Sequence, residues 1–230
     1  MTVAPRPTRA PATATGPARA GAALVALSGL LLALVAGEWG PLMSLDRTVA
    51  HGLHRRAVAE RGLTHVNRVL TDWVWDTWTM RALLAVVVLA LLVCGERRLA
   101  LWAAATSALG TFVQQSMKAA LGRERPSWPD PVDSASYAAF PSGHALTVTV
   151  TFGLLLWLSV ARGARPAVRR AVAAVGALSV LGMGFTRIYL GVHWLSDVVG
   201  GWLIGAALVT LSAAAYGRWG ANRPRPAEGA

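Results

Sequence analysis

Three short groups of residues carry side chains that suit the transfer of a phosphoryl group. They are the segments 118–126, 141–144 and 186–197, with the sequences KAALGRERP, PSGH and TRIYLGVHWLSD. Phosphoryl transfer needs fixed cations and hydrogen-bond donors, because negative charge on the equatorial oxygens must be stabilised. It also needs a nucleophile and a group that moves a proton. The three groups contain all of these parts, and we therefore expect them to form one site.

The phosphate-binding part of this predicted site consists of three cations and a helix start. Lys118, Arg125 and Arg187 supply the positive charges. Ser142 and Gly143 stand where a helix is predicted to begin, and the free N–H groups of a helix start favour an anion. Lys118 is the only lysine among 22 basic residues. Either this is chance in the composition, or it indicates a position that prefers a compact ammonium group to a guanidinium. No Cys/His cluster has metal-ligand spacing, so a structural zinc site is not expected. We expect no cofactor, and without a metal these groups would replace the usual magnesium clamp.

Two histidines and an aspartate supply the catalytic part. His193 and Asp197 are four residues apart, which places both side chains on one face of a helix if the helix has begun there. The carboxylate can then accept a hydrogen bond from one ring nitrogen, which fixes the tautomer and leaves the other nitrogen to attack phosphorus. His144 begins another helix on the same predicted side, where it can protonate the leaving alkoxide and later deprotonate water. Each residue alone has an ordinary structural explanation, but the complete set favours an enzyme.

The three groups together closely resemble the signature of the type 2 phosphatidic acid phosphatase superfamily. Its motifs are K-x6-R-P, P-S-G-H and S-R-x5-H-x3-D, and their matches here cover about 80 residues, from Lys118 to Asp197. The one departure is Thr186, which stands where the motif has Ser and keeps a hydroxyl group. The resemblance implies a helical-bundle core and a reaction without a metal ion.

The same resemblance implies a role for each matching residue. His193 would be the nucleophile, His144 the acid and base, and Asp197 the orienting carboxylate. Phosphate would be bound by Lys118, Arg125, Ser142, Gly143 and Arg187. The superfamily also includes the vanadium haloperoxidases, but those resemble soluble enzymes, whereas this chain has apolar segments of membrane-spanning length.

The elements that must position this site are predicted to be membrane helices. Hydrophobic residues make up 54% of the 230 residues, the mean hydropathy is +0.47, and about 20 apolar residues suffice for one span. Six apolar segments follow one another, at 20–37, 79–95, 98–117, 143–161, 170–187 and 195–216. We therefore predict an all-α fold, a bundle of six transmembrane helices. The net charge of +11 fits contact with anionic membrane lipids rather than nucleic acid, because the arginines mostly flank the apolar segments.

Basic residues in the short connections predict the topology of this bundle. The connections at 96–98 and 162–170 contain several arginines, which places them and both chain ends in the cytoplasm. The predicted domains are a disordered cytoplasmic tail over 1–19, a transmembrane phosphatase domain over 20–217 and a second disordered cytoplasmic tail over 218–230. The loops 118–142 and 188–194 then share the outer face, so the active site is expected at the extracytoplasmic ends of the helices. The short chain and its Ala/Arg bias favour a bacterial plasma membrane.

Three further features have more than one interpretation. Residues 38–78 are predicted to form one or two interfacial amphipathic helices. Asp72 and Asp76 are interpreted as helix caps rather than substrate contacts. The loop 127–140 is interpreted as an ordinary solvated loop, with selection of the headgroup as the alternative. The G-x-x-x-G pattern at 201–205 predicts close helix packing, within one chain or between chains.

The predicted function is that of a membrane lipid phosphatase that hydrolyses a phosphomonoester or pyrophosphate of a lipid through a phosphohistidine. The candidate substrates are a polyprenyl pyrophosphate such as undecaprenyl pyrophosphate, phosphatidylglycerophosphate and phosphatidate. An outward-facing site slightly favours the polyprenyl carrier. One alternative is a phosphotransferase that passes the phosphate to an alcohol. The other is an inactive lipid-binding or transport protein, which the presence of His144, His193 and Asp197 argues against. The oligomeric state stays open.

Overall fold

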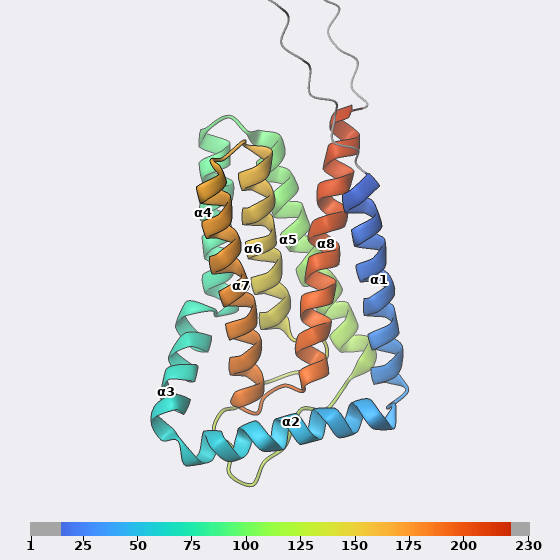
Figure 1. Cartoon of the computed structure of the whole chain (residues 1–230), viewed down its shortest axis with the longest axis vertical. Helices are drawn as coiled ribbons and strands as arrows, with labels where there is room; N and C mark the ends of the chain where they lie inside the picture. Colours follow the sequence, from blue (N-terminus) through green and yellow to red (C-terminus); the bar gives the residue numbers. More distant parts are fainter. Residues whose placement is uncertain (1–14, 222–230) are drawn as a thin grey trace, which may run out of the picture.

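The computed structural model describes residues 15–221, and every regular element in this range is a helix. In chain order these are α1 (Thr15–Ala36), α2 (Gly40–Ala59), α3 (Arg61–Val69), the π-helical turn η1 (Leu70–Val74), α4 (Thr77–Val93), α5 (Arg97–Leu121), α6 (Gly143–Ala161), α7 (Pro166–Tyr189) and α8 (Leu195–Ala221). The long helices run along one another, whereas α2 lies across one end of the bundle (Figure 1). The all-α prediction is confirmed for the described residues.

The six long helices, α1 and α4 to α8, coincide with the six predicted apolar segments. α6 has the predicted bounds, whereas α5 continues to Leu121, four residues beyond the predicted end. α1 begins at Thr15 and α8 ends at Ala221, so the inner part of each predicted tail is helical. The other residues of the predicted disordered tails, 1–14 and 222–230, lie outside the described residues.

The core of the bundle forms around α6, which contacts α4, α5, α7 and α8. Leu146, Val150, Leu154 and Leu158 recur every fourth residue along α6 and are all buried. This spacing keeps them on one face of the helix, where they pack with apolar side chains of α4, α5 and α8. The first turn of α6, which carries the PSGH group, is therefore anchored in the centre of the bundle.

Two glycines allow α8 to approach α6 closely. A methyl group added at Gly201 would lie 2.7 Å from the carbonyl oxygen of Ser142, and one added at Gly205 would lie 2.9 Å from Cβ of Thr149. Neither distance leaves room for a side chain. The G-x-x-x-G prediction is confirmed as packing within one chain, and it brings the start of α8 next to the start of α6.

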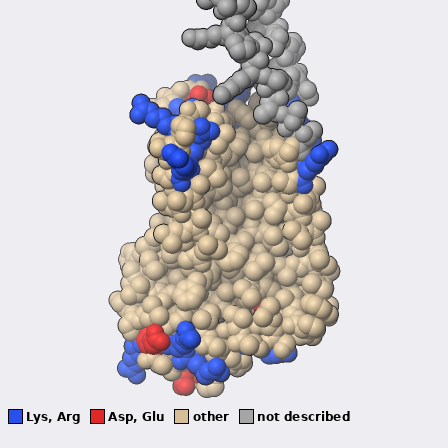
Figure 2. Space-filling model, in the orientation of Figure 1, with Lys and Arg blue, Asp and Glu red and all other residues tan. Residues whose placement is uncertain are grey.

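Five helical stretches of the described residues are long and apolar enough to cross a membrane: Gly16–Ala36, Arg61–Val93, Gly143–Ala161, Pro166–Tyr189 and Leu195–Trp219. α5 is not among them. It instead buries polar side chains, including Gln114 and Lys118, inside the bundle. Figure 2 shows charged residues gathered at the two ends of the visible face, with a tan band between them. These features support an integral membrane protein; that all six long helices span the membrane stays a prediction.

The segment 38–78 contains the helices α2 and α3 and the turn η1. Of the one or two helices predicted for this segment, it therefore forms two. α2 buries Asp46, Ala50, His54 and Ala57 along one face and packs against α7 and α8. The helix predicted to lie at the membrane interface is therefore also a structural part of the bundle end. Its buried aspartate, with only 1% of its surface exposed, needs a partner.

Asp76 caps α4, as predicted. Its Oδ2 accepts hydrogen bonds from the N–H groups of Trp78 at 2.6 Å and Thr79 at 3.4 Å. The same prediction is wrong for Asp72, which lies inside η1 and not at a helix start. The π-helical turn separates the end of α3 from the start of α4, so only the second aspartate reaches free N–H groups.

Candidate active site

The three groups of polar residues meet at the end of the bundle that α2 crosses. Ser142 donates its backbone N–H to the carbonyl oxygen of Asp197 at 2.9 Å, which joins the start of α6 to the start of α8. Nη1 of Arg125 lies 3.1 Å from Nε2 of His193, which joins the segment after α5 to the turn between α7 and α8. The expectation that the three groups form one site therefore agrees with the geometry.

His193 and Asp197 form a buried pair, although not in the way the spacing suggested. α8 begins at Leu195, so His193 lies in the preceding turn and not on the helix. Nδ1 of His193 lies 3.3 Å from Oδ2 of Asp197, and the same oxygen accepts the N–H of Trp194 at 2.9 Å. The carboxylate thus binds both the ring and the backbone of the turn that carries the ring.

The contact with Arg125 indicates the tautomer of His193. A guanidinium group can only donate hydrogen bonds, so Nε2 of His193 must accept, and its Nδ1–H then points at Asp197. The pKa of His193 lies well below its usual 6.5, because burial disfavours the charged ring and the positive charges of Arg125, Arg187 and Lys118 oppose protonation. The ring is therefore neutral at pH 7, with the lone pair of Nε2 directed toward the cations.

The loop before α6 orients two of these cations. Arg125 donates Nε to the carbonyl of Tyr137 at 2.8 Å, Nη2 to that of Ser136 at 2.9 Å and Nη1 to that of Val192 at 2.6 Å. Lys118 donates Nζ to the carbonyl of Ala138. Burial lowers the pKa of Arg125 below its usual value, and the charge of Asp197 opposes this. Arginine remains charged even so, which leaves a fixed cation beside His193.

The start of α6 offers donors without partners. Ser142 is the N-cap residue, fully buried, and its Oγ has no hydrogen-bond partner among the described residues. A methyl group at Gly143 would lie 2.7 Å from the side-chain nitrogen of Gln114 on α5. Glycine therefore lets the end of the Gln114 side chain lie against the first turn of α6. The first N–H groups of a helix have no partner within the helix and favour an anion.

Arg187 is 4% exposed, and the contacts of its guanidinium are made by Nη1. Nη1 lies 3.9 Å from Oδ2 of Asp133 and 3.3 Å from Oγ1 of Thr71, whereas Nε has no partner in the described part of the chain. Thr186 donates its hydroxyl to the carbonyl of Met183 at 2.8 Å. The threonine that replaces the serine of the motif thus has a structural contact that either hydroxyl side chain could make.

His144 lies in the first turn of α6 with its ring partly exposed. Its Nε2 is 3.8 Å from Oδ1 of Asp76, the aspartate that caps α4 with its other oxygen. The positive charges of Arg187, Arg125 and Lys118 all act on His144. The second histidine therefore faces the same cationic region as the first, from a different helix.

The interpretation of the loop 127–140 as an ordinary solvated loop is wrong, because Ala139 and Phe140 are fully buried and two further side chains have fixed contacts. Trp128 stacks on the ring of His54, with centroids 4.0 Å apart, and donates Nε1 to the carbonyl of Gly191 at 2.7 Å. Asp133 faces Arg187. The contact with His54 depends on where α2 lies, and the contact with Arg187 depends on how the loop meets α7; the composition of the loop indicates neither.

Sequence reasoning also missed Asp46 and Arg123. Nη2 of Arg123 lies 2.8 Å from Oδ2 of Asp46, and its Nη1 lies 2.5 Å from Oδ1 of Asp197. Arg123 belongs to the first predicted group, and Asp46 shares a helical stripe with Ala50, His54 and Ala57. That stripe of buried residues was the one signal in the sequence that could have drawn attention to the aspartate.

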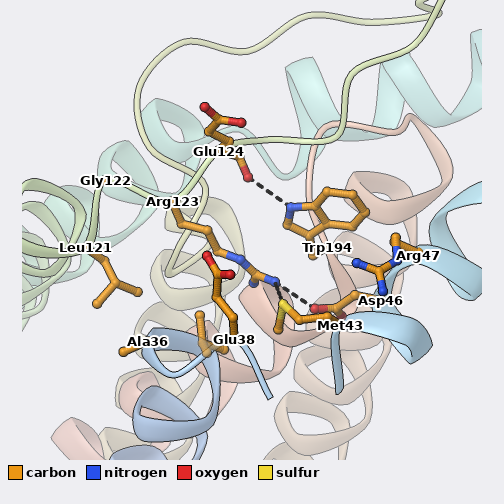
Figure 3. Close-up of a pocket in the computed structure, with 11 residues that line it drawn as sticks. Ala36, Glu38, Met43, Asp46, Arg47, Leu121, Gly122, Arg123, Glu124 and Trp194 are labelled. Carbon is orange, nitrogen blue, oxygen red and sulfur yellow. Dashed lines mark hydrogen bonds and ion pairs between the residues drawn. The ribbon is translucent and has the colours of Figure 1, made fainter. Parts of the chain in front are cut away.

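Beside Arg123 lies a cavity of about 580 Å³ (Figure 3). Its lining comes from the α1–α2 corner, the end of α5 and Trp194, and includes Glu38, Met43, Arg47 and Glu124. None of the predicted catalytic or phosphate-binding residues lines it. The cavity is therefore next to the candidate active site, with Arg123 in its wall. It is not where the phosphate would contact His193.

The fold and the site define an all-helical membrane-type protein with a buried His–Asp pair that faces fixed cations. The chain belongs to the PAP2 superfamily, whose family model matches residues 99–221. This range contains all eight predicted site residues, and it confirms the resemblance seen in the three motifs.

Known proteins resemble parts of the chain. An undecaprenyl-diphosphatase from Sulfolobus acidocaldarius is 33% identical over 84 residues, which are 36% of this chain and 34% of the relative. Phosphatidylglycerophosphatase B from Bacillus subtilis is 29% identical over 102 residues, 44% of this chain and 49% of the relative. The chain therefore spans between a third and a half of the length of these two relatives.

A solved structure shares the fold. The crystal structure of a transmembrane PAP2-type phosphatidylglycerolphosphate phosphatase from Bacillus subtilis superposes with a TM-score of 0.76. The match covers 90% of this chain and 98% of the other, with 19% sequence identity. At this identity the likeness establishes the helical architecture alone.

Proposed function

We propose that this protein is an integral membrane lipid phosphatase that hydrolyses a phosphomonoester or pyrophosphate of a lipid through a phosphohistidine, without a metal ion. One observation carries the proposal. His193 lies between Asp197 on Nδ1, at 3.3 Å, and Arg125 on Nε2, at 3.1 Å. An incoming phosphate that binds Arg125 would therefore meet the lone pair of a neutral, oriented imidazole.

The first step forms the phosphohistidine. Nε2 of His193 attacks phosphorus, and the bond from phosphorus to the lipid oxygen breaks. His144 gives a proton to the leaving oxygen, which departs as a lipid alcohol or, from a pyrophosphate, as a lipid monophosphate. The ring of His193 becomes positively charged, and Asp197 stabilises that charge through Nδ1–H.

The second step regenerates the enzyme. His144, now neutral, takes a proton from a water molecule that attacks phosphorus, and the bond between phosphorus and Nε2 breaks. Inorganic phosphate leaves and His144 carries the proton for the next cycle. In both steps the charge on the equatorial oxygens would be balanced by Lys118, Arg125 and Arg187, by the hydroxyl of Ser142 and by the N–H of Gly143, in place of a metal clamp.

The lipid tail would lie along the apolar helices while the headgroup enters the cationic region. The two relatives described above are named for undecaprenyl diphosphate and for phosphatidylglycerophosphate. We favour a polyprenyl pyrophosphate slightly, because recycling of such a carrier suits an enzyme whose site faces outward. Phosphatidylglycerophosphate and phosphatidate are the other candidates.

The activity test is phosphate release by the purified full chain from a panel of these three lipids, with and without EDTA. Wild type should release inorganic phosphate equally in both conditions, and His193→Ala should release none. His65→Ala is the matched control, because His65 is exposed on α3. Activity that survives in His193→Ala, or that EDTA abolishes, would contradict the proposal. A phosphorylated alcohol in place of free phosphate would indicate the phosphotransferase alternative.

Sidedness can be tested with the one native cysteine. Cys94 is exposed just after α4, at the end of the bundle opposite the site, and the arginines of the neighbouring connection predict a cytoplasmic position. A membrane-impermeant maleimide should spare Cys94 in intact cells and label it after permeabilisation. In a Cys94→Ser background, Tyr137→Cys, at a position that is 87% exposed, should be labelled in intact cells. The reverse pattern would place the site inside.

A further inference from the structure

Arg123 joins two buried carboxylates from different parts of the chain. Asp46 and Asp197 are 1% and 0% exposed, and each accepts a hydrogen bond from one arm of the Arg123 guanidinium, at 2.8 Å and 2.5 Å. We propose that Asp46 and Arg123 are positioning residues, which keep Asp197 ionised and aimed at Nδ1 of His193. The inference rests on the proposed function, because it assigns how the nucleophile of that reaction is held.

The charge balance supports this assignment. Two carboxylates without a cation would be costly to bury, and one of them would take up a proton. Arg123 is the cation shared by both. A protonated Asp197 could no longer act as a pure acceptor for Nδ1–H or stabilise a charged ring. Removing Arg123 should therefore affect the step in which His193 acquires charge.

The geometry also supports it. The guanidinium is a planar fork, and here one Nη serves each carboxylate, so the position of Asp46 determines the direction in which the fork faces Asp197. Asp46 is itself fixed by Ser196, whose backbone N–H donates to Oδ1 at 2.9 Å and whose hydroxyl donates to Oδ2 at 2.5 Å. Both Ser196 and Asp197 belong to the first turn of α8.

These contacts make α2 a support for the nucleophile. Asp46 binds the start of α8, and Ala57, three turns further along α2, packs against Tyr189, Leu190 and Val192. The turn that carries His193 is thus held from α2 on both of its sides. None of these contacts touches the predicted phosphate-binding groups, so the network can act on the nucleophile without acting on substrate affinity.

The opposite side of Arg123 is formed by Trp194 and the cavity shown in Figure 3. The guanidinium carbon lies 5.9 Å from the centroid of the Trp194 ring, whose Nε1 donates to the carbonyl of Glu124 at 2.9 Å. Arg47 lines the same cavity and is exposed. It is a matched control: an arginine beside the same cavity that bridges no pair of carboxylates.

The test compares steady-state and single-turnover kinetics of variants of the full chain. We expect Arg123→Gln to lower kcat and the rate of phosphohistidine formation about 100-fold, the size of effect that misplacing a reacting group produces. KM should change by no more than about threefold, because a group that leaves substrate contacts intact alters kcat and not uniform binding. Arg123→Lys keeps the charge without the fork and should recover part of the loss. Arg47→Gln should stay within about twofold of wild type, as for ordinary surface changes.

A double-mutant cycle separates positioning from general damage. Asp46→Asn alone should lower kcat, and Asp46→Asn combined with Arg123→Gln should be no worse than Arg123→Gln alone, because the two residues act through one contact. Multiplied losses would overturn the inference. Asp46→Asn and Arg123→Lys provide the test if Arg123→Gln does not fold.

The two proposals fail in different ways. If wild type releases no phosphate, or if His193→Ala remains active, the proposed function fails. If wild type is active and His193→Ala is not, while Asp46→Asn and Arg123→Lys both keep kcat within about twofold of wild type, the positioning inference fails and the proposed function stands.

Discussion

Nη1 of Arg125 lies 3.1 Å from Nε2 of His193, and Asp197 holds the opposite nitrogen of the same ring at 3.3 Å. A donor on one side and an acceptor on the other leave the neutral ring one tautomer, with its lone pair toward the cations. The proposed nucleophile is thus oriented before any substrate arrives. The predictions below follow from this orientation, from the groups around it and from the helix packing that supports it.

Asp197→Asn should lower kcat strongly with little change in KM. The amide keeps the shape of the carboxylate but can present an N–H to Nδ1, which would favour the wrong tautomer and remove the charge that stabilises phosphohistidine. The corresponding change in a serine protease triad costs about 10⁴-fold in kcat, and we expect a loss of similar order here. The rate of phosphohistidine formation can be measured by mixing the enzyme with radiolabelled lipid phosphate, quenching at set times and counting the labelled protein. A variant that forms phosphohistidine at the wild-type rate would contradict an orienting carboxylate.

Arg125→Lys should be far from neutral although it conserves the charge. Lysine cannot reproduce the donation of Nε, Nη1 and Nη2 to three carbonyl groups of two segments. The loop and the turn with His193 would lose their common anchor, and the proposed phosphate site would lose one oriented donor. We expect kcat/KM to fall about 100-fold, as when one preorganised donor is removed. Arg55→Lys, at an exposed position on α2, is the control and should show wild-type kinetics.

The apolar segments were predictable because each has one physical cause, a continuous run of residues that a bilayer accepts. α6 matches its predicted bounds, since a helix start at Ser142-Gly143 and polar residues after Ala161 mark both ends. The apolar run ends before Lys118, but α5 continues past this residue. In the structure Lys118 is buried inside the helix, which ends at Leu121 and is followed by the capping residue Gly122, with a φ of +60°.

The candidate site was predictable as far as its motifs reach, and the supporting contacts were not. Lys118, Arg125 and His193 could be found from residue type and spacing. The pairing of Arg123 with Asp46 joins residues 77 positions apart and depends on α2 lying across the bundle end. Hydrophobic periodicity predicts that α2 lies at the membrane interface, but it does not indicate which other helices α2 contacts. The contact of Trp128 with His54 on α2 was missed for the same reason, whereas that of Asp133 with Arg187 depends on how the loop folds onto α7.

Gly201→Ala should destabilise the protein and lower its activity. The added methyl group would lie 2.7 Å from the carbonyl oxygen of Ser142, so α8 or the first turn of α6 must move. Overpacking of this kind costs about 1–3 kcal/mol, and the displaced residue belongs to the predicted phosphate site. Thermal unfolding in detergent and phosphate release measure the two effects.

Gly29→Ala is the matched control for that substitution. Gly29 lies inside α1, and a methyl group there meets nothing within 4 Å. Alanine favours a helix over glycine by about 1 kcal/mol, so this variant should be as stable as wild type or slightly more stable, with unchanged activity. If both substitutions gave the same melting temperature, close packing of α8 on α6 would be disproved.

The acid limb of the pH profile should move when Arg125 is neutralised. In the proposed reaction His193 attacks phosphorus only as the neutral ring, so activity should be lost as the pH falls through its pKa. Burial, with Arg125, Arg187 and Lys118, holds that pKa well below 6.5. Arg125→Gln removes one of the opposing charges, which raises the pKa of His193 and moves the loss of activity to higher pH. The profile of kcat/KM for both proteins on one substrate measures this, because the phosphate of that substrate titrates identically in both series. An acid limb that stays in place, or moves to lower pH, in Arg125→Gln would show that Arg125 does not control the protonation of the nucleophile.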